Sequence, residues 1–404
     1  MKPLRVAIVT RRFWPLLGGP EKVLANLAAE LLARGLHPTI LTARWHDAWS
    51  AELLFQDVPV LRLASPPQGR WSTWRYLRSL ARALRSRAER FDLVYVSQLR
   101  QEAEAALCAA RGAPVVLRAE RVGRQGDCLW QLDAPGGLRI KRRCLEAAAV
   151  VAPTRAAQRE LQAAGYPRHS IVYLADGVPL PPPRTPQTRA AARALWAETH
   201  PDLQLPDQAL LAVAMGPLPI GGELDRLLAA WQPIAGQFPR GRLWLVGPVA
   251  DRAAVQRQIQ RRQLAGRVVA AGAFDQVEEL LAAADLLLAP SPEGAHATLL
   301  EAMAAGLPIV AADTIDHRAV LADGEEGLLV ADDDATALSA AIARFCQDAE
   351  LAARCGRAAR DRAAAEFSLA RMADQHVTWF QQLCANRESS TSSPRSTARA
   401  PRSN

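Results

Sequence analysis

The chain has 404 residues, of which half are apolar and 22% are charged, a balance typical of globular proteins with buried cores. Its formal net charge is +8, and the basic residues are almost all arginine. No helix-turn-helix, zinc finger or RNA-binding aromatic motif accompanies that charge, so we expect no nucleic-acid partner.

The apolar residues are spread along the chain, and no run approaches the roughly 18 consecutive apolar residues that a membrane span needs. The six cysteines form no CxxC pair and no Cys/His zinc spacing. That pattern favours idle thiols in a reducing compartment. We therefore expect a cytoplasmic protein without a metal site.

The first 178 residues alternate short apolar runs with amphipathic stretches. Strands are predicted at 6–9, 39–42, 58–63, 93–96, 115–117, 148–152 and 171–174, and helices at 22–33, 75–87 and 102–110. This alternation is typical of βαβ units, which build a parallel sheet and bind ligands at the carboxyl ends of its strands. Residues 1–178 are therefore predicted to form one Rossmann-like domain.

A second, similar domain follows a break in composition. Five prolines fall within residues 179–186, which favours an extended tether, and we predict a linker over 179–206. Strands are then predicted at 210–215, 242–246, 268–271, 286–289 and 308–311, with helices at 224–231, 253–262, 277–283 and 299–304. The second domain is expected to span 207–370. Residues 387–404 have almost nothing to bury and are expected to be disordered.

The fold class expected from these elements is α/β, with two Rossmann-like parallel-sheet domains facing across a cleft, a preferred place for a small-molecule site. Residues 291–330 predict what binds there. Glu293 lies in a Pro- and Gly-marked loop after a strand, and Glu301 follows within an Ala- and Leu-rich helix. Such a helix start offers free N–H groups to a phosphate, and a carboxylate beside it accepts hydrogen bonds from sugar hydroxyls. The stretch thus predicts a nucleotide-sugar site.

The same stretch resembles the signature of the GT4-type (group 1) retaining glycosyltransferases of the GT-B fold. Their E-A-M-A-x-G-x-P-V-V-A is matched by residues 301–311, and their D-G-x-x-G-L-L-V by residues 323–330. Gly18, Gly19 and Glu21 resemble the family's G-G-x-E, and residues 34–39 its R-G-H-x-V-T. The likeness runs from about residue 6 to 380. It also implies that a helix over 371–386 crosses back onto the first domain.

The resemblance implies transfer of a hexosyl unit from a nucleotide-diphosphate sugar to an acceptor hydroxyl, with retention and without a metal or other cofactor. The acceptor is expected to be a glycan or a lipid-linked sugar of cell-envelope or exopolysaccharide synthesis. Glu293 would contact the donor sugar as a catalytic residue, and Glu301 would bind the ribose. Further donor contacts are expected from Ala295, His296, Ala297, Thr298, Gly216 and Arg318, and the acceptor and phosphate loop would contain Gly18, Gly19, Arg121 and Arg124.

The chain departs from the family at several of these positions. The family places Arg and Lys after the first strand of the second domain to neutralise the donor diphosphate, and here Pro217 and Gly222 stand instead. Arg121, Arg124 and Arg318 are the expected replacements. Glu120 stands where the family has a His at a strand end. It is predicted either to bind a hydroxyl as a catalytic group or to pair with Arg118 or Arg121.

Residues 71–87 combine tryptophans with arginines. Trp74, Leu77, Leu80 and Leu84 would share one helical face, and the arginines another. A helix packed on the sheet is expected, with peripheral contact to an anionic membrane at the inner face of the cell membrane as the alternative.

Two other functions stay open. A catalytically degenerate protein would bind sugar nucleotide or glycan as a partner subunit, because the diphosphate-binding cations are missing. A glycosyl phosphorylase or sugar-nucleotide epimerase would use the same fold, which alone does not separate these activities.

Overall fold

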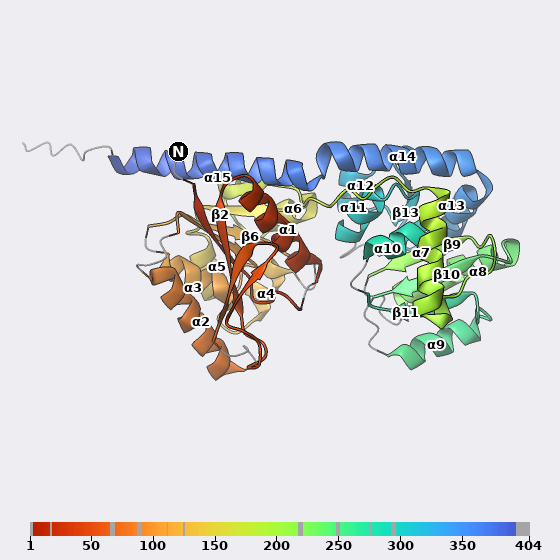
Figure 1. Cartoon of the computed structure of the whole chain (residues 1–404), viewed down its shortest axis with the longest axis horizontal. Helices are drawn as coiled ribbons and strands as arrows, with labels where there is room; N and C mark the ends of the chain where they lie inside the picture. Colours follow the sequence, from red (N-terminus) through yellow and green to blue (C-terminus); the bar gives the residue numbers. More distant parts are fainter. Residues whose placement is uncertain are drawn as a thin grey trace, which may run out of the picture.

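The computed structural model describes residues 3–16, 18–64, 69–86, 91–110, 112–123, 126–216, 221–247, 251–274, 277–291 and 296–392, with side chains up to residue 387. Its strands form one sheet of eight and one sheet of six. The predicted α/β class with two parallel-sheet domains is confirmed. Figure 1 shows the two domains next to each other, bridged along one side by the last two helices.

The first sheet has the order β3-β4-β2-β1-β5-β6-β7-β8, in which all neighbours run parallel except β3 and β4. Its strands are β1 (Arg5–Val9), β2 (His37–Ala43), β3 (Glu52–Phe55), β4 (Val58–Leu63), β5 (Leu93–Ser97), β6 (Val115–Arg118), β7 (Ala149–Ala152) and β8 (Ile171–Tyr173). The helices of the same domain are α1 (Gly19–Ala33), α2 (Arg70–Arg85), α3 (Gln101–Ala109), α4 (Asp127–Asp133), α5 (Gly137–Cys144) and α6 (Arg155–Ala163). The central strands are continuous apolar runs because both faces of the sheet are covered.

The second sheet has the order β11-β10-β9-β12-β13-β14 and is parallel throughout. Its strands are β9 (Leu211–Met215), β10 (Arg242–Val246), β11 (Val268–Gly272), β12 (Leu286–Ala289), β13 (Ile309–Ala312) and β14 (Leu328–Val330). The helices around it are α8 (Gly222–Gln237), α9 (Arg252–Arg261), α10 (Val277–Ala283), α11 (His296–Ala304), α12 (Ile315–Val320), α13 (Ala335–Gln347) and α14 (Ala349–Glu366).

The expected linker is only partly a linker. Helix α7 (Pro186–Thr199) begins at its last proline, which is a favoured first residue because its missing N–H would have no partner there. Arg193 of α7 pairs with Asp285 at 2.6 Å, and Trp196 is buried against Phe274. The predicted linker over 179–206 is therefore wrong for the residues of α7, which form a helix that packs on the second domain.

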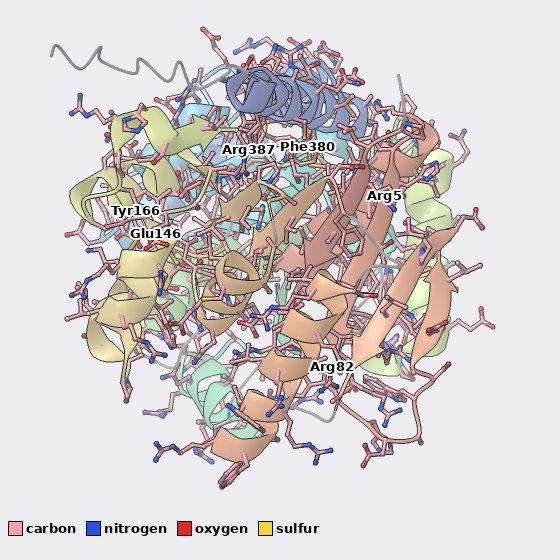
Figure 2. The ribbon with its side chains drawn as sticks, turned by 90° about the vertical axis from the view of Figure 1, so that its left-hand side faces the viewer. Arg5, Arg82, Glu146, Tyr166, Phe380 and Arg387 are labelled. Atoms are coloured by element: carbon pink, nitrogen blue, oxygen red, sulfur yellow. The ribbon has the colours of Figure 1, made fainter. Side chains whose placement is uncertain are left out.

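The chain crosses between the domains twice, at neighbouring places. Val178 donates its N–H to the carbonyl of Phe367 at 2.8 Å, and Leu369 donates to the carbonyl of Val178 at 3.2 Å. Helix α15 (Leu369–Ser392) then lies along the first domain (Figures 1 and 2), where Phe380 is fully buried against Tyr95. The predicted return of the last helix is confirmed by these contacts. The helix runs to Ser392, past the expected start of the tail at 387, and residues 393–404 lie outside the described part.

Candidate functional site

In each sheet, the strand order reverses direction at one pair of neighbouring strands. In the second sheet β9 lies beside β12, with β10 and β11 on one side and β13 and β14 on the other. In the first sheet β1 lies beside β5 in the same way. Loops at the carboxyl ends of such adjacent strands diverge and leave a crevice, where open α/β sheets bind their ligands. The loop after β12 leads directly into α11.

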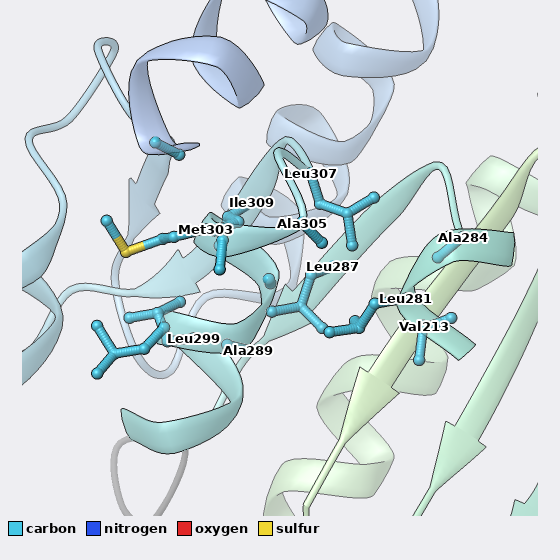
Figure 3. Packing of buried hydrophobic residues seen from close by; sticks show 14 of the residues in the cluster. Val213, Leu281, Ala284, Leu287, Ala289, Leu299, Met303, Ala305, Leu307 and Ile309 are labelled. Atoms are coloured by element: carbon cyan, nitrogen blue, oxygen red, sulfur yellow. The ribbon is translucent and has the colours of Figure 1, made fainter. Parts of the chain in front are cut away.

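Helix α11 is held in place by its apolar face. Leu299, Leu300 and Met303 are fully buried in a cluster with β12 and β13 (Figure 3). Glu301 is only partly buried, and it lies within electrostatic reach of Lys22 of α1 in the other domain and of Glu278 of α10. Burial raises the pKa of Glu301 to about 7, an effect that Lys22 opposes and Glu278 adds to. The carboxyl group predicted to bind ribose is therefore half-buried at the domain boundary.

The first turn of α11 consists of His296, Ala297 and Thr298. The N–H groups of the first turn have no partner within a helix, which agrees with their predicted role as backbone donors. The imidazole of His296 is turned inward, with both ring nitrogens buried and no partner for either among the described residues. Burial lowers the pKa of His296. At neutral pH the ring is thus uncharged.

Glu120 follows β6 at the carboxyl edge of the first sheet. Its carboxylate accepts a hydrogen bond from Ser97 Oγ at 3.2 Å, and its backbone N–H donates to Asp127 at 2.9 Å. Burial raises the pKa of Glu120, and the carboxylate of Asp127 adds to that rise. Arg118 forms its ion pair with Asp176 at 2.7 Å and not with Glu120. The other predicted partner of Glu120, Arg121, stays a prediction.

Two of the predicted glycines have their amides occupied. The N–H of Gly18 donates to Glu21 Oε2 at 2.9 Å, within the capping box that begins α1. The N–H of Gly216 donates to the carbonyl of Val246 at 2.9 Å. Gly19 is the exposed first residue of α1. Of these three amides, only that of Gly19 has the open position of a first helical residue.

Two of the arginines predicted to replace the family's diphosphate-binding cations lie at the surface. Arg318 pairs with Asp313 and its side chain is 67% exposed, and Arg121 is also exposed. Gly222 is the first residue of α8, so no cation stands there. Glu293, Ala295, Arg124 and Pro217 lie outside the described residues, and their roles stay predictions.

Helix α2 buries a different face from the expected one. Tyr76, Leu80 and Leu84 are its buried residues, and the helix packs on the first domain, as expected. Trp74 was predicted on the apolar face, but it is 49% exposed, because the phase of the buried face is set by Tyr76. Trp74 instead contacts Trp71, which is 79% exposed. The tryptophans therefore form an exposed pair at the start of α2.

Lys22, Asp127 and Asp176 were missed by the sequence reasoning. Asp176 follows β8, and a polar residue after a buried strand is the same signal that identified Glu120. Lys22 carries no comparable signal, since a lysine in a first helical turn is ordinarily a surface residue. Asp127 is only 1% exposed and accepts hydrogen bonds from Arg100 and from the backbone N–H of Glu120. These contacts exist only in the folded chain, so no local sequence pattern indicates them.

Among the described residues, no group of three or more His, Cys, Asp or Glu side chains has a geometry suited to a metal ion. Within the same part, none of the helices combines the length and apolarity required to cross a membrane.

Comparison with known proteins identifies the family. The family described as "Glycosyl transferases group 1" matches residues 211–348, and "Glycosyltransferase Family 4" matches residues 17–181. A phosphatidyl-myo-inositol mannosyltransferase of Mycolicibacterium smegmatis is 37% identical over 131 residues, which are 31% of this chain and 33% of that protein. The chain spans between 18% and 42% of the length of the first curated relatives it matches.

Solved structures share the whole fold. Sucrose-phosphate synthase from Thermosynechococcus elongatus superposes with a TM-score of 0.74 at 21% identity, covering 95% of this chain and 100% of that one. Anabaena HepE, solved in complex with UDP and glucose, has a TM-score of 0.74 at 19% identity, covering 94% of this chain and 100% of that one. These likenesses show the GT-B arrangement of two domains. The two family matches, which cover most of both domains, show that the chain belongs to the group 1 (family 4) glycosyltransferases.

Proposed function

We propose that this protein transfers a hexosyl unit from a nucleoside-diphosphate sugar to an acceptor hydroxyl, with retention at the anomeric carbon. The observation that carries the proposal is the position of Glu301 at the crevice of the second sheet, within electrostatic reach of Lys22 of the first domain. A donor bound there would touch both domains. Family membership and the helix N-terminus at the start of α11, a favourable place for a phosphate, support the same reaction.

Each part of the donor then has a proposed partner. Glu301 accepts hydrogen bonds from the ribose hydroxyls, the first turn of α11 binds the diphosphate, and Glu293 contacts the hexosyl ring. The reaction breaks the bond from the anomeric carbon to the diphosphate oxygen and forms one to the acceptor oxygen on the same face. The acceptor proton passes to the departing phosphate. Glu120 orients the acceptor hydroxyl from the first domain.

Calorimetric titration of the full chain with UDP-, GDP- and ADP-hexoses tests the proposal. We expect micromolar binding of one donor, slow hydrolysis without acceptor, and loss of that hydrolysis in Glu293→Ala. NMR of the product would give the anomeric configuration, and retained activity in EDTA is expected if no metal takes part. Wild-type protein that binds none of these donors would overturn the proposed function.

A degenerate, binding-only protein is the second candidate, because Pro217 and Gly222 replace two cations of the family. Charge stabilisation of a leaving group is commonly a large catalytic contribution, about 3–4 kcal/mol for one donor. The two candidates differ in turnover. Tight donor binding with no hydrolysis and no transfer to any glycan acceptor would favour the binding-only protein.

We further propose a glycan or lipid-linked acceptor of cell-envelope or exopolysaccharide synthesis, met at the cytoplasmic face of the membrane. The exposed Trp71 and Trp74 and the arginines of α2 support peripheral contact with anionic lipid. Vesicles of phosphatidylglycerol should sediment the protein, and those of phosphatidylcholine should not. The double variant W71A/W74A should weaken sedimentation several-fold, whereas the change Trp49→Ala, outside α2, should leave it unchanged. Equal sedimentation by both lipids would contradict the contact.

A further inference from the structure

Gln98 has a backbone conformation that few side chains adopt. In the described part of the chain, five residues other than glycine have a left-handed φ angle: Gln56, Asp57, Gln98, Gln208 and Gln263. All but Gln98 lie in turns, where such angles are ordinary. Gln98, with a φ of 76°, directly follows the buried strand β5 at the crevice of the first sheet. This conformation is unfavourable for a residue with a Cβ atom, and strain of this kind persists mainly at functional sites.

The backbone of Gln98 is fixed against the loop that contains Glu120. Gln98 donates its N–H to the carbonyl of Arg118 at 2.9 Å, and Glu120 donates its own N–H to the buried carboxylate of Asp127 at 2.9 Å. Ser97, which is only 2% exposed, donates from Oγ to the carboxylate of Glu120 at 3.2 Å. The side-chain amide of Gln98 hydrogen-bonds to the same carboxylate. Two consecutive residues at the end of β5 therefore hold one carboxyl group, whose backbone is already anchored.

The left-handed backbone explains how two consecutive residues reach the same carboxyl group. Successive side chains of a strand point to opposite faces of its sheet. An extended Gln98 would accordingly point away from the side chain of Ser97, and the left-handed φ breaks this alternation. A glycine would adopt the same angle without strain, but it would supply no amide. The sequence thus combines an unfavourable backbone angle with the side chain that makes use of it.

We infer that Gln98 is a positioning residue that aims the carboxylate of Glu120 at the acceptor hydroxyl. The inference rests on the proposed function, in which Glu120 orients that hydroxyl. An ionised carboxylate accepts about four hydrogen bonds. The donors from Ser97 and Gln98 therefore fix its direction and still leave lone pairs for the acceptor.

Gln98→Gly separates this role from a role in folding, because the two roles predict opposite effects on stability. Glycine relieves the backbone strain, so the melting temperature should rise by about 2 °C. The probe is hydrolysis of the nucleoside-diphosphate hexose that the wild type binds, in which water takes the place of the acceptor. Its kcat should fall about 10- to 100-fold, while the donor Kd from calorimetry should stay unchanged.

Two further variants sharpen the comparison. Gln98→Asn keeps an amide and tolerates the left-handed region, so it should recover part of the lost rate. Gln263→Gly is the matched control, because Gln263 has a φ of 58° in an exposed turn after α9 of the second domain. Its melting temperature should rise by a similar amount, and its hydrolysis rate should not change.

The pH dependence of hydrolysis is a second readout, which a purely structural role would not move. The amide of Gln98 opposes the rise in the pKa of Glu120, because it donates to the charged form. The acidic limb of the pH–rate profile should therefore move to higher pH in Gln98→Gly. Asp127, Arg118 and Glu21, the charged groups that act on Glu120, are the same in both proteins.

The possible failures are distinguishable. If Gln98→Gly leaves kcat and the pH profile unchanged, or if it melts below the wild type, the inference is wrong although the proposed function stands. A wild type that binds no donor, or that binds one without hydrolysing it, would overturn the proposed transfer reaction and the inference together.

Discussion

Burial has a larger effect than charged neighbours on the two carboxyl groups of the candidate site. Desolvation is the main cause of the raised pKa of both Glu120 and Glu301. Asp127 holds the backbone of Glu120, and Arg100 in turn pairs with Asp127 at 3.0 Å. With its pKa raised to about 7, Glu301 keeps its proton until the pH approaches neutrality. Its ability to accept hydrogen bonds from a substrate therefore changes within the physiological pH range.

Glu301→Gln tests this at the residue scale. The pKa of Glu301 lies at about 7 in the folded state, above its ordinary value of 4.5, so the folded state binds the extra proton between these values. The stabilisation is complete below about pH 4.5 and is lost as the pH rises to 7, with an upper limit of about 3 kcal/mol. The melting temperature of the wild type relative to Glu301→Gln should accordingly fall between pH 5 and 8. A constant difference would contradict the raised pKa.

Donor binding should show the opposite trend. Only the ionised carboxylate of Glu301 accepts two hydrogen bonds from ribose, so wild-type affinity should rise between pH 6 and 8. In Glu301→Gln the affinity should be weaker and independent of pH. A wild-type Kd that does not vary with pH would remove Glu301 from the nucleotide site.

At the scale of elements, the position of α11 depends on close backbone packing by α14. A Cβ atom on Gly356 of α14 would lie 2.4 Å from the carbonyl oxygen of Gly306, which follows α11. Only glycine allows this approach, because the neighbouring atom belongs to the backbone and cannot rotate away. The two helices are in contact along this line. The glycine of the E-A-M-A-x-G motif thus helps to place the helix that contains Glu301.

Gly356→Ala should destabilise the second domain by about 1–3 kcal/mol, since α14 must shift to admit the methyl group. Gly236→Ala is a matched control in α8, where a Cβ would meet nothing within 4 Å. It should raise stability by up to about 1 kcal/mol, because alanine is the better helix former. Thermal unfolding followed by circular dichroism measures both. Equal melting temperatures for the two variants would show that α14 adjusts without cost.

The limits of sequence reasoning are clearest among these elements. Buried strands such as β1 and β12 were predicted because unbroken apolar runs favour central parallel strands. Strand β3 was missed, since its hairpin turn uses Gln56 and Asp57 in left-handed conformations where glycine or asparagine is the usual signal. Helix α7 was missed because its prolines read as a tether, although the last of them begins the helix.

For the site, the sequence indicated residues after strands but not their pairing. The partner of Arg118 is Asp176, 58 residues further along the chain, and no local pattern connects the two. The same holds for the electrostatic effect of Lys22 on Glu301, since the two residues belong to different domains. Such pairings depend on how whole domains are placed, and that information is spread over the entire fold.

At the scale of the whole molecule, one hydrogen bond fastens the domains beside the candidate site. Asp316 of α12 accepts the N–H of Ala156, in the first turn of α6, at 2.8 Å. Thr154 caps the same helix from within the first domain. The contact between α12 and α6 therefore joins the second domain to the first.

Asp316→Ala should weaken this contact by about 1 kcal/mol, the typical effect of losing a helix cap. The two domains should then sample wider separations, because one of the contacts that join them, apart from the two crossing segments, has been lost. Small-angle X-ray scattering should give a larger radius of gyration than for the wild type. Asp313→Ala, which removes an exposed pair with Arg318 in the same region, is the control and should not change it. Identical scattering from both variants would refute the fastening role.

The return of α15 to the first domain has a consequence for how the protein is made. Met372 and Phe380 belong to the same apolar cluster as Ile8 and Tyr95. A ribosome releases Ile8 early and Phe380 only after the entire second domain has been synthesised. One side of the first domain consequently remains uncovered throughout synthesis of the second, and its exposed apolar surface is a target for chaperones during that interval. The second domain, whose strands and helices are nearly contiguous in the chain, can complete its core first.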